Sequence, residues 1–141
     1  MDVGRGIPEA AALALLALLA LLAVACHREH PAERKTKVVW RPVGSWSGHG
    51  DAQTDSFEIG YTQVRVRWEA RNEKPAGQGT LRVTVNSAVS GRDLAVAVDH
   101  NGPGHDIDYV AVEPHWSYLV INSKNLDWSV IVEEPAVVDS P

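Results

Sequence analysis

The chain has 141 residues, of which 45% are hydrophobic, and its formal net charge at pH 7 is −5. This length suits a single domain with a sizeable core. The acidic balance argues against binding to a phosphate backbone, which depends on clustered lysine and arginine, so no nucleic-acid partner is expected.

The N-terminal part of the sequence predicts export. Residues 10–25 form an unbroken run of alanine, leucine and valine, and the charged stretch HREHPAERKTK follows at once. The run has the length of a secretory h-region and falls short of the roughly 20 residues that a membrane-spanning helix needs. We therefore expect residues 1–25 to form a signal peptide with a helical core.

The only cysteine of the chain, Cys26, directly follows Ala23 and Ala25 of an A-x-A cleavage pattern. An ordinary signal peptidase site with a chance cysteine, giving simple secretion, is one interpretation. The stretch LLAVAC at residues 21–26 instead resembles the lipobox of bacterial lipoproteins, whose cysteine thiol takes a diacylglycerol. That resemblance implies lipidation of Cys26, a membrane partner through an N-terminal lipid anchor, and localisation in the bacterial cell envelope.

Residues 26–37 contain mainly histidine, arginine, glutamate, lysine and proline, and almost nothing apolar. Such a composition cannot bury enough surface to offset the entropy of ordering the chain. We expect a flexible tether here.

From residue 38 onward the hydrophobic period is close to two, which indicates strands that are buried on one face. In QVRVRWEA, for example, Val64, Val66 and Trp68 alternate with charged residues. The predicted strands are 37–40, 55–59, 63–70, 80–85, 93–99, 107–113, 116–122 and 127–133, with turn-forming residues between them. No helix is predicted after Cys26. The fold expected is therefore all-β, an antiparallel two-sheet β-sandwich at residues 38–134, with a disordered tail at 135–141.

Two stretches carry a further resemblance. The pattern Gly-x-Gly-Asp-x-Gln-Thr-x-x-Phe at residues 48–57 and the closing LDWSVIVEE at 126–134 resemble small secreted bacterial β-sandwich domains of the jelly-roll or CUB-like kind. The resemblance implies a fold and no particular activity.

The sequence offers little for catalysis, so the chain is not expected to be an enzyme. No serine lies in a Gly-x-Ser-x-Gly elbow, and Ser47 in WSGHG lacks the first glycine. Asp106 and Asp108 alternate on a predicted strand and could face the same way, but carboxylates near a loop edge are more often solvated.

Histidines and aspartates gather in two loops. His49 and Asp51 lie in one, and Asp99, His100, His105 and Asp106 bracket NGPG in the other. Imidazole with carboxylate suits zinc, whereas the three aspartates 51, 99 and 106 would suit calcium. The spacing matches no compact ligand signature, and both loops have the composition that turns require. No cofactor is therefore predicted, and a divalent metal stays an alternative.

The tryptophans suggest a third kind of site. Trp68 and Trp128 lie in the apolar phase of their strands and are expected in the core. Trp46 lies among glycines and is the best candidate for stacking on a sugar ring. The favoured interpretation is that residues 44–57 turn the chain and that Trp46 and Phe57 cap the core.

The leading prediction is a lipid-anchored, non-catalytic binding or structural module of the cell envelope, with an envelope protein or a glycan as partner. A carbohydrate- or metal-binding domain is the alternative.

Overall fold

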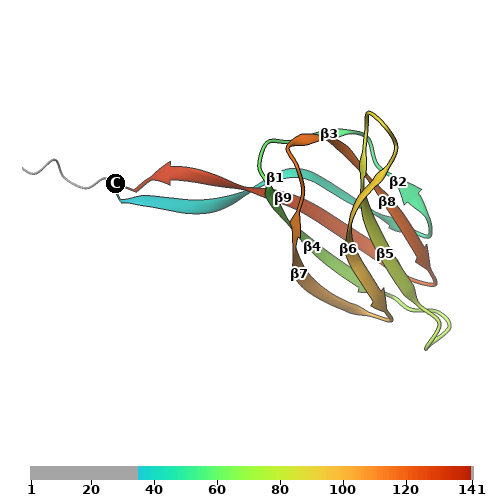
Figure 1. Cartoon of the computed structure of the whole chain (residues 1–141). Coiled ribbons are helices and arrows are strands. Elements are labelled where there is room, and N and C mark those ends of the chain that lie inside the picture. Colours follow the sequence, from blue (N-terminus) through green and yellow to red (C-terminus); the bar gives the residue numbers. More distant parts are fainter. Residues whose placement is uncertain (1–34, 141) are drawn as a thin grey trace, which may run out of the picture. The chain divides into compact units, whose positions relative to one another are not determined.

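The computed structural model describes residues 35–140, which form two antiparallel sheets packed against each other (Figure 1). The strands are β1 (Thr36–His49), β2 (Ala52–Gln53), β3 (Phe57–Ile59), β4 (Gln63–Arg71), β5 (Thr80–Ser87), β6 (Asp93–Asn101), β7 (Gly104–Ala111), β8 (His115–Lys124) and β9 (Asp127–Asp139). The predicted all-β sandwich is confirmed, with nine strands instead of about eight. The predicted signal peptide and Cys26 lie outside the described residues. Within 35–140 the structure has no helix long and apolar enough to cross a membrane.

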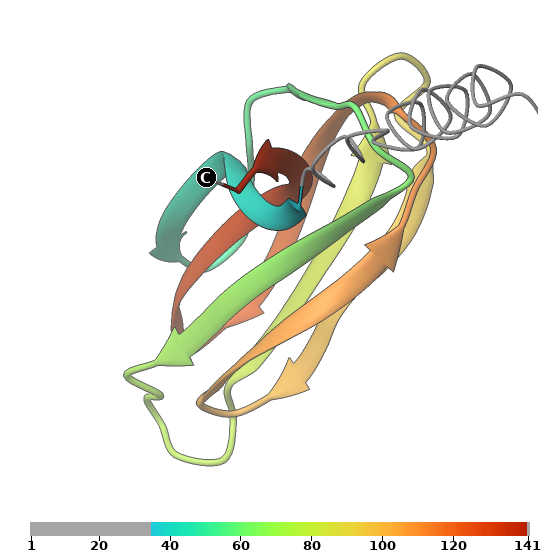
Figure 2. The ribbon, with the colours of Figure 1, turned by 90° about the vertical axis from the view of Figure 1, so that its left-hand side faces the viewer.

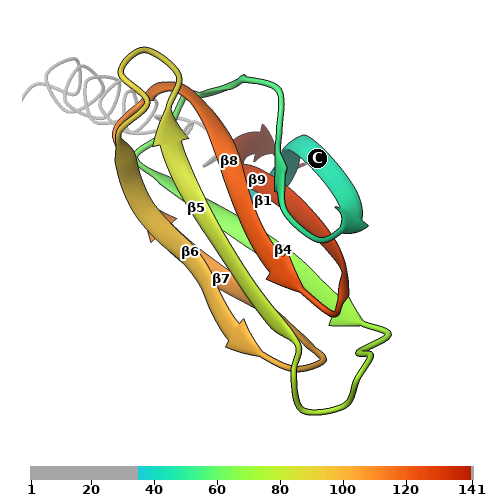
Figure 3. The same ribbon diagram turned by 90° about the vertical axis from the view of Figure 1, so that its right-hand side faces the viewer.

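One sheet has four strands in the order β1-β9-β4-β7 and is seen from its outer side in Figure 2. The other has the order β2-β8-β5-β6, with β3 also pairing with β8, and it faces the viewer in Figure 3. All pairs of neighbouring strands in residues 35–140 are antiparallel. Along the chain, only β2 and β3, and β5 and β6, are consecutive strands of the same sheet, and every other connection passes from one sheet to the other, so residues from both sheets enclose a single core.

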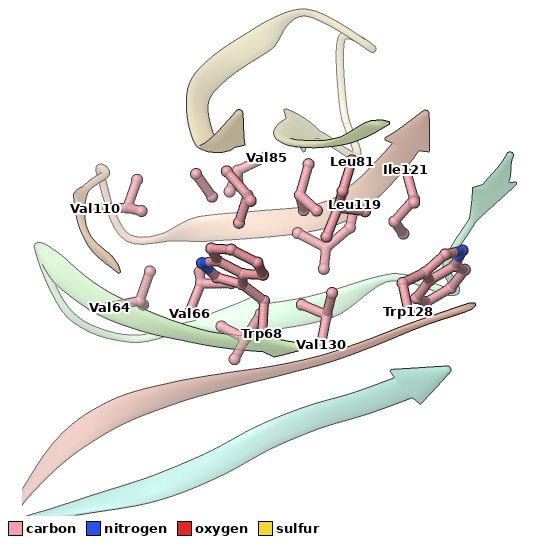
Figure 4. Packing of buried hydrophobic residues seen from close by; sticks show 14 of the residues in the cluster. Val64, Val66, Trp68, Leu81, Val85, Val110, Leu119, Ile121, Trp128 and Val130 are labelled. Atoms are coloured by element: carbon pink, nitrogen blue, oxygen red, sulfur yellow. The ribbon is translucent and has the colours of Figure 1, made fainter. Parts of the chain in front are cut away.

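The core consists of the alternate side chains that point inward from both sheets. On β4 these are Val64, Val66 and Trp68, as the period of two predicts. Figure 4 shows Trp68 within the layer between the sheets and Trp128 at one end of it. The buried apolar residues are Phe57, Ile59, Val64, Val66, Trp68, Ala70, Leu81, Val83, Val85, Ala97, Val98, Val110, Val112, Leu119, Ile121, Leu126, Trp128, Val130 and Val132.

Two predicted boundaries are wrong. Strand β9 continues to Asp139, through most of the predicted disordered tail at 135–141, and β1 begins at Thr36, inside the predicted tether at 26–37. The reason is mutual pairing, since Thr36 lies opposite Asp139 and Val38 opposite Val137. The sequence predicts a strand at 37–40 but none at 135–139, where only the pairing with β1 extends β9.

This pairing extends beyond the rest of the sandwich. Strand β9 pairs with β4 only up to Glu133, whereas its pairing with β1 continues to the end. We call residues 36–41 and 134–139 the arm. It is a two-stranded ribbon that projects from the four-stranded sheet (Figure 1).

The predicted corner at residues 44–57 is shorter than expected. Residues 44–49 belong to β1 and pair with β9, and the chain turns at Gly50, whose φ of 75° suits glycine. At Gly44, glycine is required by packing and not by a turn, because a Cβ there would lie 2.0 Å from Cη2 of Trp46. Pairing with β9 thus overrides a composition that is typical of turns.

The segment after this turn follows one edge of β8. The Asp51 carboxylate accepts a hydrogen bond from the amide of Ser123 at 2.9 Å, and the Thr54 hydroxyl accepts one from the amide of Leu119 at 2.9 Å. Strands β2 and β3 pair with β8 on either side of Thr54. The Gly-x-Gly-Asp-x-Gln-Thr-x-x-Phe pattern therefore has a structural role in fastening this edge.

Candidate functional site

The outer face of the four-stranded sheet carries a groove of about 720 Å³. Its lining residues come from β4, β7 and β9 and are Arg67, Trp68, Glu69, His105, Asp106, Ile107, Ser129 and Ile131. All stand on paired strands, so the backbone beneath the groove is held by the ladder hydrogen bonds of the sheet. We call this feature the groove.

The strand register arranges the groove in two rows. Arg67 on β4 lies opposite Ile131 on β9 and Ile107 on β7, so that two apolar side chains flank one cation. Glu69 lies opposite Ser129 and His105 in the next row. Directly opposed residues on one face have side chains close enough to contact the same ligand.

The acid–base residues of the second row are not arranged for nucleophilic catalysis. Such catalysis needs a base beside the serine and an acid behind the base. Here Glu69 stands between Ser129 and His105 in the register, and its carboxylate accepts a hydrogen bond from Arg71 at 3.3 Å. The row offers hydrogen-bonding groups to a ligand instead.

Beside the groove, Glu133 is buried under two arginines. Its carboxylate accepts a hydrogen bond from Nε of Arg65 at 2.5 Å and lies 3.3 Å from Nη2 of Arg67. The hydrogen bond to Glu133 raises the pKa of the Arg65 guanidinium above its ordinary value. This pairing holds Arg67 at the edge of the groove and neutralises part of its charge.

An aromatic group marks the end of the face nearest the arm. Tyr109 is 58% exposed and lies opposite Arg65, on the same side of β7 as Ile107. Its ring meets the ring of Trp40 edge to face, with centroids 5.7 Å apart, and the Arg65 guanidinium lies 4.8 Å from the Trp40 ring. The face therefore carries an apolar surface that continues from the groove toward the arm.

The six residues considered for metal binding do not form one site. His105 and Asp106 line the groove, whereas Asp51 and Asp99 line a smaller groove of about 340 Å³ on the five-stranded sheet, where Asp99 pairs with Arg82 at 2.6 Å. His100 packs on Trp68, with ring centroids 4.8 Å apart. In the described part of the chain, no three histidine, cysteine or acidic side chains are grouped to hold a metal ion.

His49, the sixth of these residues, binds a carboxylate. Its Nδ1 donates to Oδ1 of Asp127 at 2.8 Å, and Nδ2 of Asn72 donates to Oδ2 at 2.7 Å. The hydrogen bonds from Asn72 and then His49 lower the pKa of the Asp127 carboxyl. Both oxygens of the Asp127 carboxylate thus have protein donors.

Trp46 is not placed as a stacking platform. Its ring packs against Phe57, with centroids 5.2 Å apart, and its Nε1 donates to Asp55 at 2.8 Å. It covers the edge of the core, as the favoured interpretation expected. The exposed tryptophan is Trp116, which stands on β8 on the outer face of the five-stranded sheet.

A serine–histidine pair lies outside both grooves. The Ser87 hydroxyl and Nε2 of His115 are 2.7 Å apart. The same oxygen accepts hydrogen bonds from the amides of Val89 and Ser90, and Ser87 is buried. The Ser87 hydroxyl thus closes the loop of the β5–β6 hairpin and joins it to the start of β8, which is a structural role.

Sequence reasoning found His105 and Asp106 but missed the rest of the groove. The alternation in QVRVRWEA could have indicated two more of its residues. Because Val66 and Trp68 point into the core, Arg67 and Glu69 must point outward. The sequence does not show which strands pair with β4, because β9 and β7 come from distant parts of the chain. No protein-family model matches the chain, and no curated protein matches it.

Proposed function

We propose that the chain is a non-catalytic binding module of the bacterial cell envelope, held to a membrane by a lipid on Cys26, and that it binds a glycan in the groove. The observation that carries the proposal is the groove itself, in which Ile107 and Ile131 flank Arg67 while Glu69 and His105 stand in the next row. Binding sites commonly combine apolar contacts with a few fixed polar groups.

The charge of the groove favours a neutral ligand. Arg67 and Glu69 stand side by side on one face of β4, and each has an ion-pair partner, so neither an anion nor a cation finds a single-sign field. Serine, imidazole, guanidinium and carboxylate groups supply both donors and acceptors. A sugar presents hydroxyls together with apolar ring faces, and it fits this combination.

Tyr109 supplies an aromatic ring for such a ligand. The double variant Ile107→Ala/Tyr109→Ala is expected to bind the best glycan of a panel at least about tenfold more weakly, which corresponds to about 1.4 kcal/mol. Both side chains are exposed, so the fold should stay intact. Isothermal titration calorimetry with envelope polysaccharide fragments measures the affinity.

The matched control is Trp116→Ala, which removes an exposed aromatic residue from the opposite sheet. It should leave the affinity unchanged. A loss confined to the control would move the site to the five-stranded sheet, and a panel without any bound glycan would reject the proposed ligand class.

Lipidation is tested separately from binding. Cys26 is the only thiol of the chain, so Cys26→Ser removes the acceptor for a diacylglycerol. When the chain is produced in a bacterium, the unmodified protein is expected to partition into the detergent phase of a Triton X-114 separation and the variant into the aqueous phase. Equal partitioning of both proteins would contradict lipidation and leave simple secretion.

A further inference from the structure

Three rows of outward side chains follow one another along β4 on the face that carries the groove. Glu69 and Arg67 define the two rows of the groove, and Arg65 defines a third, in which it lies opposite Tyr109 on β7 and Glu133 on β9. From Arg65 to Glu69 the strand extends about 13 Å, and β9 and β7 lie about 10 Å apart across β4. The three rows therefore form a strip that is longer than one sugar ring.

Each row offers a different kind of contact. The first row, at Glu69, adds a serine hydroxyl and an imidazole. The second row, at Arg67, places an isoleucine on each side of the guanidinium. The third row, at Arg65, presents the ring of Tyr109, which is 58% exposed. A single sugar ring cannot reach all three rows, whereas successive rings of one chain can.

The ring of Tyr109 is held in position by its neighbours. Trp40, which comes from β1, meets it edge to face with centroids 5.7 Å apart, and the guanidinium of Arg65 lies 4.8 Å from the Trp40 ring. Arg65 is in turn fixed by its ion pair with the buried Glu133. A ring held in this way loses little freedom when a ligand binds, and this favours affinity.

We propose that the ligand of the groove is a linear chain of neutral sugars, of which three units contact the protein, and that the third unit stacks on Tyr109. This inference rests on the proposed function, since it assumes a glycan in the groove. The rows stand in a line on one strand, so a straight chain meets them in succession. The recognised feature is therefore a chain of sugars and not a single sugar.

The dependence of affinity on chain length tests this proposal. The probes are fragments of one to six units from β-1,4-linked glucose, from β-1,4-linked N-acetylglucosamine and from the neutral envelope polysaccharides of the panel. In isothermal titration calorimetry the affinity is expected to rise with each unit up to the third. The gain at the third unit should be about tenfold, as one added aromatic contact would give, and longer fragments should gain little more.

Variants of the groove face separate the rows. Tyr109→Ala should remove the gain at the third unit and weaken the binding of two-unit fragments only slightly, whereas Ile107→Ala should weaken all fragments of two or more units alike. Tyr109→Phe keeps the ring and should recover most of the gain. The control is Trp116→Ala, which removes an exposed aromatic residue from the opposite sheet and should leave the length dependence as it is.

Two results would overturn the proposal and still leave a glycan in the groove. The first is an affinity that is already complete with a single sugar unit. The second is a Tyr109→Ala variant that loses affinity by the same factor for fragments of every length. A panel in which no fragment of any length binds would reject the glycan itself, and the chain of three units with it.

Discussion

Replacing Trp128 by alanine is expected to lower the free energy of unfolding by about 3–5 kcal/mol, as large-to-small core substitutions do. The side chain is almost completely buried. Its ring lies against Gly48, where a Cβ would come within 2.8 Å of Cζ2, and its Nε1 donates to the carbonyl of Gly50 at 2.8 Å. Alanine would leave a cavity at this end of the core and an unpaired carbonyl at the β1–β2 turn.

Urea unfolding measures this loss, provided that the m-value is unchanged between the two proteins. The control is Trp116→Ala, since Trp116 is exposed on the outer face of the five-stranded sheet. That substitution should cost about 1 kcal/mol or less. Equal losses for the two variants would mean that Trp128 does not hold the two sheets together.

The parts of the fold that could be predicted are the strands whose own sequence alternates between apolar and polar residues. Val64, Val66 and Trp68 alternate with outward residues, and this alternation alone identifies β4 and its buried face. The same holds for Trp128 at the start of β9, where the alternation with Val130 and Val132 gave the correct buried face.

The parts that could not be predicted depend on a partner strand. Gly44 and Gly48 are typical of turns, yet they lie in β1 because β9 pairs along its whole length. The prediction of a disordered tail was wrong for the same reason, since Val137 pairs with Val38, which is far away in the sequence. Local composition does not contain this information.

The candidate site, too, could be predicted only as far as the pattern of a single strand allows. That Arg67 and Glu69 point outward could be derived from the period of β4, but their neighbours Ile107, Ile131 and Ser129 are set by the order β9-β4-β7. The histidines and aspartates that the sequence groups in two loops are distributed over both sheets by the topology. Spacing along the chain is a weak guide to a site on a sheet face, because such a site is built across strands.

Replacing Glu133 by glutamine is expected to lower the free energy of unfolding by about 3 kcal/mol, because removing one partner of a buried ion pair leaves an uncompensated charge. The Glu133 side chain is 6% exposed, and Arg65, its closer partner, is 19% exposed. Glutamine keeps the shape of the side chain, so the loss reports charge and hydrogen bonding and not packing.

The matched control is Glu69→Gln, which removes the same charge from an exposed pair on the next strand of the same face. Glu69 and its partner Arg71 are 51% and 49% exposed, and exposed pairs of this kind contribute at most about 1 kcal/mol. Salt distinguishes the two cases further, since ions screen the exposed pair and reach the buried one much less. In urea unfolding at low and high salt, Glu133→Gln should therefore keep most of its effect, while the small effect of Glu69→Gln disappears. Similar losses for both variants would show that water reaches Glu133 and that Arg67 is not held at the groove by a buried charge.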